Sequence, residues 1–194
     1  ALVVANAVET VRALEPEMIC YGHHGPVVGR QLIQDELTAL YKAIIHVHDE
    51  TVAGMNSGKD IHTLMSEITL PPEMEVGQGY GKVSWSVRAI WESYGGWFHH
   101  RSTTELYAVP RSSVADDIID LAGGASAVLE RAEHKFSSGE HEQAIHLLDI
   151  IRDAGADTAE SRKLGVRVHE ALLEKTDNFW LSSWLKNQVK LLDA

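Results

Sequence analysis

The chain has 194 residues, of which 44% are hydrophobic and 23% are charged, and its formal net charge is −11 at pH 7. These proportions are typical of a folded globular protein, and an acidic chain without a lysine- or arginine-rich run is not expected to bind nucleic acid. No apolar run is long enough to span a membrane, and the single cysteine excludes an intrachain disulfide.

The first 30 residues read as the edge of an α/β domain. Residues 1–14 have apolar positions at helical spacing, and Pro16 is expected to end that helix. The run EMICY, residues 17–21, predicts a short buried strand in which Cys20 would be an inert thiol. A lone strand leaves two unpaired edges, so this segment favours a remnant of a larger α/β protein.

A helical pattern begins at about Gln31. Residues 31–55 predict one long helix, Gly58 suits a left-handed cap, and Asp60 is expected to cap a helix over residues 61–68. The segment HVHDE lies within the long helix. Side chains two residues apart on a helix point about 200° apart, so His46 and His48 are not expected to share a metal.

The rest of the chain is predicted to be predominantly helical. A glycine-rich loop, VGQGYGK, precedes a helix over residues 83–94, and an irregular segment of residues 97–110 follows it. Ser113 begins a sequence typical of a capping box. Several helix-length units then follow, and their spacing resembles tetratricopeptide helix pairs, although too few for a solenoid. The predicted fold class is therefore mainly α, with a helical domain preceded by a short α/β remnant.

The motif His23-His24-Gly25-Pro26 is the strongest candidate for chemistry. A histidine after a strand, on a short loop held by glycine and proline, can direct a ring nitrogen toward a cavity. On these residues alone, a metal ligand and a loop histidine bonded to a backbone carbonyl are equally good interpretations.

Longer stretches carry a resemblance. GHHGPVVG, HDETVAGMNSGKDIHTLMSEITLPP, GYGKVSWSVRAIWESYGGWF and STTELYAVP are similar to the end of a metallo-β-lactamase-fold domain that continues into the dimerisation domain of the alkylsulfatases. The resemblance places the end of the catalytic domain at residues 1–30 and the helical dimerisation domain at residues 31–194. It implies a parent hydrolase that cleaves sulfate esters of alkyl chains at a binuclear zinc site.

The resemblance makes His24 a zinc ligand and leaves His23 beside it in a lesser role. The other ligands would lie upstream of this chain, in a missing N-terminal catalytic part. Because a catalytic zinc takes about three protein ligands, the chain alone is not expected to hydrolyse a substrate.

One position departs from the family pattern. Trp85 stands where the family has a histidine that is proposed to protonate the leaving alcohol. The catalytic acid is therefore unknown, with His62, His99 and His100 as substitutes by residue type only. Tyr80 and Trp85 are candidate wall residues for an alkyl chain. A related metallo-hydrolase acting on another ester or a lactam is the alternative.

The resemblance also implies a homodimer. Trp91, Tyr94, Trp97 and Phe98 are candidate interface residues, because aromatic side chains are enriched at interfaces, and ordinary core packing is the competing interpretation. A rival function is a non-catalytic helical module in which residues 125–175 bind a partner protein. The sequence does not decide between a periplasmic and a cytoplasmic location.

Overall fold

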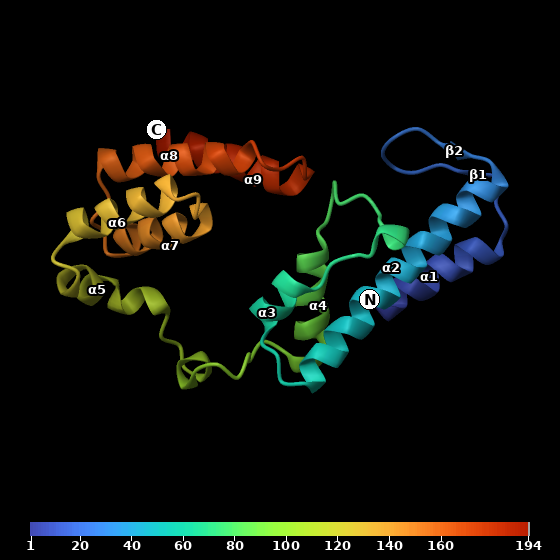
Figure 1. Cartoon of the computed structure of the whole chain (residues 1–194), viewed down its shortest axis with the longest axis horizontal. Helices are drawn as coiled ribbons and strands as arrows, with labels where there is room; N and C mark the ends of the chain where they lie inside the picture. Colours follow the sequence, from blue (N-terminus) through green and yellow to red (C-terminus); the bar gives the residue numbers. More distant parts are fainter. Residues whose placement is uncertain (194) are drawn as a thin grey trace. The chain divides into compact units, whose positions relative to one another are not determined.

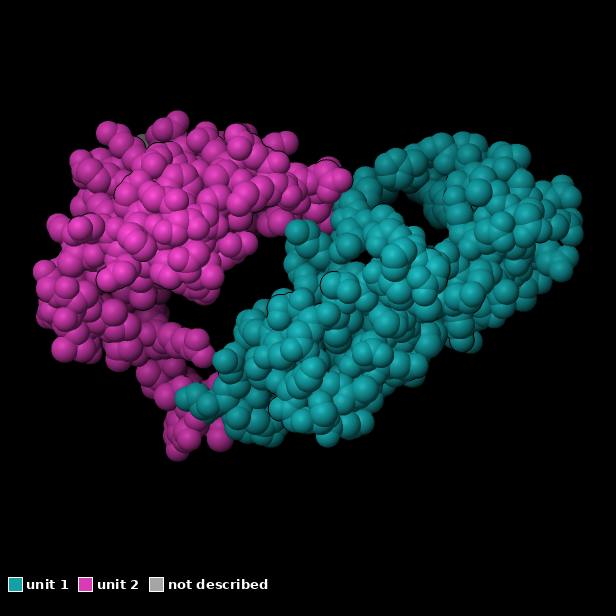
Figure 2. Space-filling model, viewed as in Figure 1, with its two compact units in different colours: residues 1–102 teal, residues 103–194 magenta. Residues whose placement is uncertain are grey.

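The computed structural model describes residues 1–193 and divides into two compact units, shown in different colours in Figure 2. Unit 1 is Ala1–Ser102, and unit 2 begins at Thr103. The predicted fold class is confirmed, because helices dominate and the described residues form one small sheet of two strands. The boundary expected between residues 30 and 31 lies inside unit 1. As a division between a catalytic remnant and a helical domain, it stays a prediction.

Unit 1 is built around one long helix. Its helices are α1 (Leu2–Ala13), α2 (Arg30–Asn56), α3 (Ile61–Glu67) and α4 (Val83–Gly95), with a 3₁₀ turn at Pro72–Met74. Figure 1 shows α1 running beside the first half of α2, where Val8, Ile33 and Leu37 form a buried cluster. A second cluster, which includes Val47, Leu64 and Trp91, joins the other half of α2 to α3 and α4. The apolar residues along α2 therefore contribute to both buried clusters, one with α1 and one with α3 and α4.

The turn between α2 and α3 confirms the predicted caps. Gly58 has a φ of 80°, the left-handed conformation that glycine adopts without steric cost. The Asp60 carboxylate accepts hydrogen bonds from the backbone N–H groups of His62 and Thr63. The Thr63 hydroxyl also donates to this carboxylate, and these bonds lower the pKa of Asp60 below its ordinary value of 3.8.

The predicted buried strand is wrong in two respects. The strand β1 has only two residues, Met18–Ile19, and it pairs antiparallel with β2, Val27–Val28. Met18 is 54% exposed and Cys20 is an exposed free thiol, so neither is buried as expected. The second strand was missed because its two valines are too short a run to show period-two alternation. In this chain the segment is a short exposed hairpin.

Unit 2 is a stack of helix pairs. It begins with 3₁₀ turns at Thr103–Leu106 and Arg111–Val114. Its helices are α5 (Ala115–Leu121), α6 (Ala125–Ser137), α7 (His141–Asp153), α8 (Ala159–Leu173) and α9 (Phe179–Asp193). The helices pack in pairs, as the spacing predicted, with α6 on α7 and α8 on α9. Core side chains such as Ala132, Ala144 and Leu164 lie where the helices approach closely.

The capping prediction for unit 2 is wrong in position. Ser113 lies in a 3₁₀ turn, and α5 starts without a side-chain cap. The capping box is at α8 instead, where Thr158 and Ser161 exchange side-chain and backbone hydrogen bonds. Across residues 1–193, no helix combines the length and apolarity needed to cross a bilayer.

Candidate functional site

The hairpin in unit 1 presents the two adjacent histidines. The backbone N–H of Gly29 donates to the carbonyl of Glu17 at 2.9 Å, which closes the base of the hairpin below the β1–β2 pair. At the tip, His24 has a φ of 71°. Residues other than glycine seldom adopt this conformation, and such strain is often found at functional sites. The imidazole is thus held in a specific backbone geometry and remains exposed.

Tyr80 lies beside these histidines. Its ring centroid is 5.8 Å from that of His24, in an edge-on arrangement, and 6.4 Å from that of His23, with nearly parallel ring planes. Tyr80 comes from the glycine-rich loop before α4, so the fold joins two segments that are far apart in sequence. His24 and Tyr80 were both singled out from the sequence, but nothing in the sequence indicated their contact.

Residues 1–193 do not contain a complete metal centre. Within residues 1–193 there is no group of three or more His, Cys, Asp or Glu side chains that could hold a metal ion. The Cys20 thiol lies 3.8 Å from the thioether sulfur of Met18. His24 is therefore at most one ligand of a site that needs others, and its role as a zinc ligand stays a prediction.

Trp85 lies on the first turn of α4, with its side chain 38% exposed. Of the substitutes named by residue type, His99 and His100 follow the other end of α4. A helix of 13 residues is about 20 Å long, so those two imidazoles are not placed beside Trp85. His62 is on α3. The structure therefore places His99 and His100 away from the position that lacks the family histidine, whereas His62 lies on a helix that packs against α4.

His99 has a local structural role instead. Its Nε2 lies 3.1 Å from a carboxylate oxygen of Glu92, and its ring packs edge-on against Trp91. The hydrogen bond from Arg88 to the same carboxylate, supported by His99, lowers the pKa of Glu92. This network fixes the segment that follows α4.

The four aromatic interface candidates separate into buried and exposed members. Trp91 is 8% exposed and packs inside the core of unit 1, in accord with the core interpretation. Tyr94 and Trp97 are 57% and 70% exposed, and Phe98 is half-buried with its ring centroid 6.1 Å from that of Trp97. Tyr94 and Trp97 therefore remain available to a partner.

Tyr94 is fixed by a hydrogen-bonded histidine. His48 is buried on α2, where its Nε2 lies 2.8 Å from the Tyr94 hydroxyl and its Nδ1 lies 2.7 Å from an Asp49 carboxylate oxygen. His46 contacts the backbone carbonyl of Thr69 at 3.1 Å. The two histidines point to different neighbours, as their spacing of two residues on a helix predicts.

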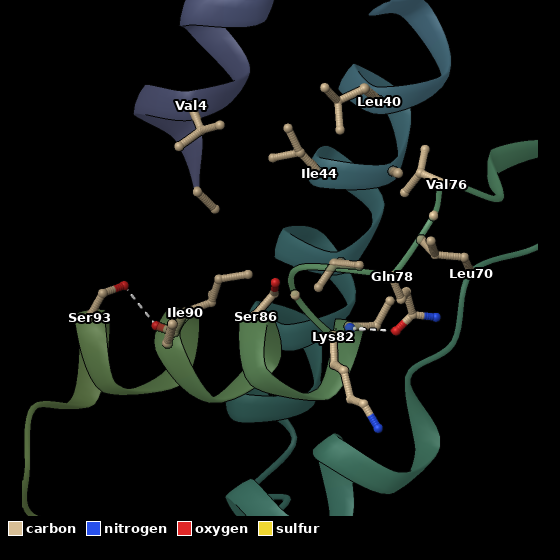
Figure 3. Close-up of a pocket in the computed structure, with 17 residues that line it drawn as sticks. Val4, Leu40, Ile44, Leu70, Val76, Gln78, Lys82, Ser86, Ile90 and Ser93 are labelled. Atoms are coloured by element: carbon tan, nitrogen blue, oxygen red, sulfur yellow. Dashed lines mark hydrogen bonds between the residues drawn. The ribbon is translucent and has the colours of Figure 1, made fainter. Parts of the chain in front are cut away.

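Unit 1 also contains an apolar cavity of about 400 Å³. Figure 3 shows its walls, formed by side chains of α1, α2, α4 and the segment of residues 70–83. Apolar wall residues include Val4, Leu40, Ile44, Leu70, Val76 and Ile90. The sequence analysis missed this cavity. One signal was present, because Ser86, Ala89 and Ser93 recur at helical spacing on α4 and leave that face with small side chains.

Comparisons with known proteins agree on one family. A family model described as alkyl sulfatase dimerisation matches residues 60–192. A linear primary-alkylsulfatase of a Pseudomonas strain is 28% identical over 191 residues, which cover 95% of this chain and 36% of that protein. An alkyl/aryl-sulfatase of Saccharomyces cerevisiae is 27% identical over 174 residues, which cover 87% of this chain and 27% of that protein. The chain thus spans about a third of the length of these relatives.

A solved structure shows the same fold. The stereoselective inverting sec-alkylsulfatase Pisa1 from Pseudomonas sp. superposes with a TM-score of 0.87. The match covers 97% of this chain and 31% of that chain, at 21% identity.

Proposed function

Because this chain belongs to the alkyl sulfatase dimerisation family, we propose that it joins two copies of an alkylsulfatase-type hydrolase. The family match over residues 60–192 is the observation that carries the proposal. It includes α4, the aromatic segment after it and nearly all of unit 2. A symmetric contact between identical patches is the commonest way in which soluble proteins form dimers.

The exposed aromatic pair of unit 1 is the proposed contact surface. Tyr94 and Trp97 lie at and just after the C-terminal end of α4, and both expose more than half of their side-chain area. Buried Trp91 anchors the same helix in the core. The bond between Tyr94 and buried His48 holds the phenol in one position, so less conformational freedom is lost on association.

For the longer protein we propose hydrolysis of alkyl sulfate esters, as the names of the relatives indicate. This chain would contribute His24 as one ligand of a zinc site and Tyr80 as the neighbour that orients it. The residues described here do not complete that site, so the chain alone is expected to be inactive. Metal content of a longer form, compared with its His24→Ala variant, tests the ligand role.

Sedimentation equilibrium tests the dimer. We expect Trp97→Ser to weaken self-association at least about 30-fold, which corresponds to an interface hot spot of about 2 kcal/mol. Trp184→Ser is the matched control, because Trp184 is 62% exposed on α9 in unit 2. Equal self-association of both variants and the unaltered chain would contradict the proposed surface.

A second candidate function has its own observation. Trp180, Trp184 and Leu191 are 58%, 62% and 62% exposed and lie within about 40° of one another around α9. Such a stripe suits a helical module that binds a different protein. The same experiment separates the two functions, since a chain that stays monomeric would favour the module, whereas dissociation only on Trp184→Ser would move the dimer contact to α9.

A further inference from the structure

The apolar cavity of unit 1 is built to receive an uncharged chain. Its walls are mainly aliphatic side chains on three helices, and Lys82 has the only charged side chain among the residues that line it, which also include the N-terminal residue Ala1. In Figure 3 the Lys82 side chain extends away from the space between Val4, Ile44 and Val76. A volume of about 400 Å³ is within the range of about 300–1,000 Å³ that is usual for small-molecule sites. A charged group held among the aliphatic side chains would be desolvated without a partner.

The polar groups at the wall leave one hydroxyl available. The side-chain oxygen of Gln78 accepts from the backbone N–H of Val83 at 3.0 Å, and the Ser93 hydroxyl donates to the carbonyl of Ile90 at 2.7 Å. Within residues 1–193 the Ser86 hydroxyl has no protein partner, and Figure 3 shows it pointing from α4 toward the cavity. A ligand with a hydroxyl head could therefore exchange a hydrogen bond with Ser86.

We propose that this cavity binds an unbranched primary alkanol, with its aliphatic chain against α1, α2 and α4 and its hydroxyl at Ser86. The choice of an alkanol rests on the proposed function. An alkyl sulfate and water give an alkanol and hydrogen sulfate, so the alkanol is the product that such a hydrolase must release. The cavity would hold that product within unit 1.

A chain-length series tests the tail. Hexanol, octanol and decanol are titrated into the ¹⁵N-labelled chain, and amide shifts of residues 83–93 are followed by NMR. Each added methylene should tighten binding about fourfold, because burying one CH₂ group contributes about 0.8 kcal/mol. Equal affinities for hexanol and decanol would overturn the site. Shifts that appear on α9 instead of α4 would overturn it as well.

Octyl sulfate, used below its micelle concentration, tests the head group. The alkanol should bind more tightly than the sulfate of the same chain length, because the cavity offers the Ser86 hydroxyl and its only charged side chain, Lys82, extends away from it. Tighter binding of octyl sulfate would overturn the assignment of an uncharged head.

Two variants test the location. Ala89→Phe places a ring in the cavity and should weaken octanol binding at least tenfold, whereas Lys42→Phe adds the same ring to an exposed position of α2 and should have no effect. Ser86→Ala removes only the hydroxyl and should weaken octanol more than octane. Unchanged octanol binding in Ala89→Phe with an unaltered circular dichroism spectrum would refute the proposal.

Parallel sedimentation separates this inference from the dimer proposal. If the unaltered chain self-associates but binds no alkanol, the cavity proposal fails and the proposed function stands. If Ala89→Phe abolishes self-association, the occupant of the cavity is a second copy of the chain and the alkanol proposal is wrong.

Discussion

Units 1 and 2 contain similar lengths of chain but bend their backbones in different ways. Within residues 1–193 the residues of unit 2 with positive φ are glycines, such as Gly139 at 78° and Gly155 at 64°, and they follow helix ends. The non-glycine residues with positive φ are Glu15, His24 and His100, and all three lie in unit 1. Strained backbone is costly and is kept where the surrounding structure requires it.

This difference separates scaffold from site. In unit 2 each turn uses the residue that the geometry prefers, and helix pairs bury a continuous core of small and branched side chains. In unit 1 long connections bring Tyr80 to His24 and leave a cavity beside α4. Unit 2 therefore has the properties of a structural support, whereas unit 1 contains the features suited to ligands.

The largest effect is expected from the core of unit 2. Leu164 is 2% exposed, and Leu164→Ala should lower the free energy of unfolding by about 3 kcal/mol through lost burial and a residual cavity. Urea denaturation followed by circular dichroism measures this. A loss below about 1 kcal/mol would mean that the helix pairs of unit 2 repack freely and are not a rigid support.

Two helix glycines sharpen the comparison between the units. A Cβ at Gly54 on α2 would overlap the Leu64 side chain, whereas one at Gly165 on α8 would be 3.0 Å from the nearest carbon of Leu192. We expect Gly54→Ala to destabilise unit 1 by about 1–2 kcal/mol through overpacking. Gly165→Ala should be near neutral, because the better helix propensity of alanine offsets the closer contact. Equal effects in thermal denaturation would contradict this account.

The strain at His24 predicts a gain in stability. His24→Gly should stabilise the fold by about 1 kcal/mol relative to His24→Ala, because only glycine adopts a φ of 71° without steric cost. Gly139→Ala in unit 2 is the opposite substitution at a similar φ, and it should lower the free energy of unfolding by about 1 kcal/mol. If His24→Gly and His24→Ala are equally stable in chemical denaturation, the hairpin tip is not strained.

The smallest effect concerns pH. The pKa values of Asp60, which caps α3, and of Glu160 on α8 are both lowered, Asp60 mainly by the Thr63 hydroxyl and Glu160 mainly by its own backbone N–H. A lowered folded-state pKa gives stability that is complete above the ordinary value and is lost as pH falls through the folded value. Asp60→Asn keeps a cap but should flatten the loss of stability between about pH 5 and pH 2. Glu160→Gln is the comparison in unit 2. If neither substitution changes the slope of the unfolding free energy against pH, the lowered pKa values of Asp60 and Glu160 are both contradicted.

Local signals made the helices predictable. The spacing of apolar residues over 31–55 predicted α2, and Gly58 and Asp60 predicted the turn after it, because caps depend on neighbours in sequence. The prediction at Ser113 failed since a hydroxyl caps only when the following residues are already helical. The strand at residues 17–21 failed because a short apolar run does not specify burial, which is set by the rest of the fold.

The site was predictable only residue by residue. His24, Tyr80 and Trp97 were named from the sequence, but the contact between the first two depends on how α2 and α4 pack. Trp91 and Tyr94 are three residues apart on α4, yet one is buried and the other exposed. The cavity required small residues on α4 to meet aliphatic residues of α1 and α2, which no local pattern shows.

The central claim is that this chain joins two copies of itself, and sedimentation velocity over a range of concentrations tests it most directly. The account predicts a species with twice the chain mass of 21.4 kDa at tens of micromolar, shifting to monomer on dilution. A single species of one chain mass at every concentration would contradict it.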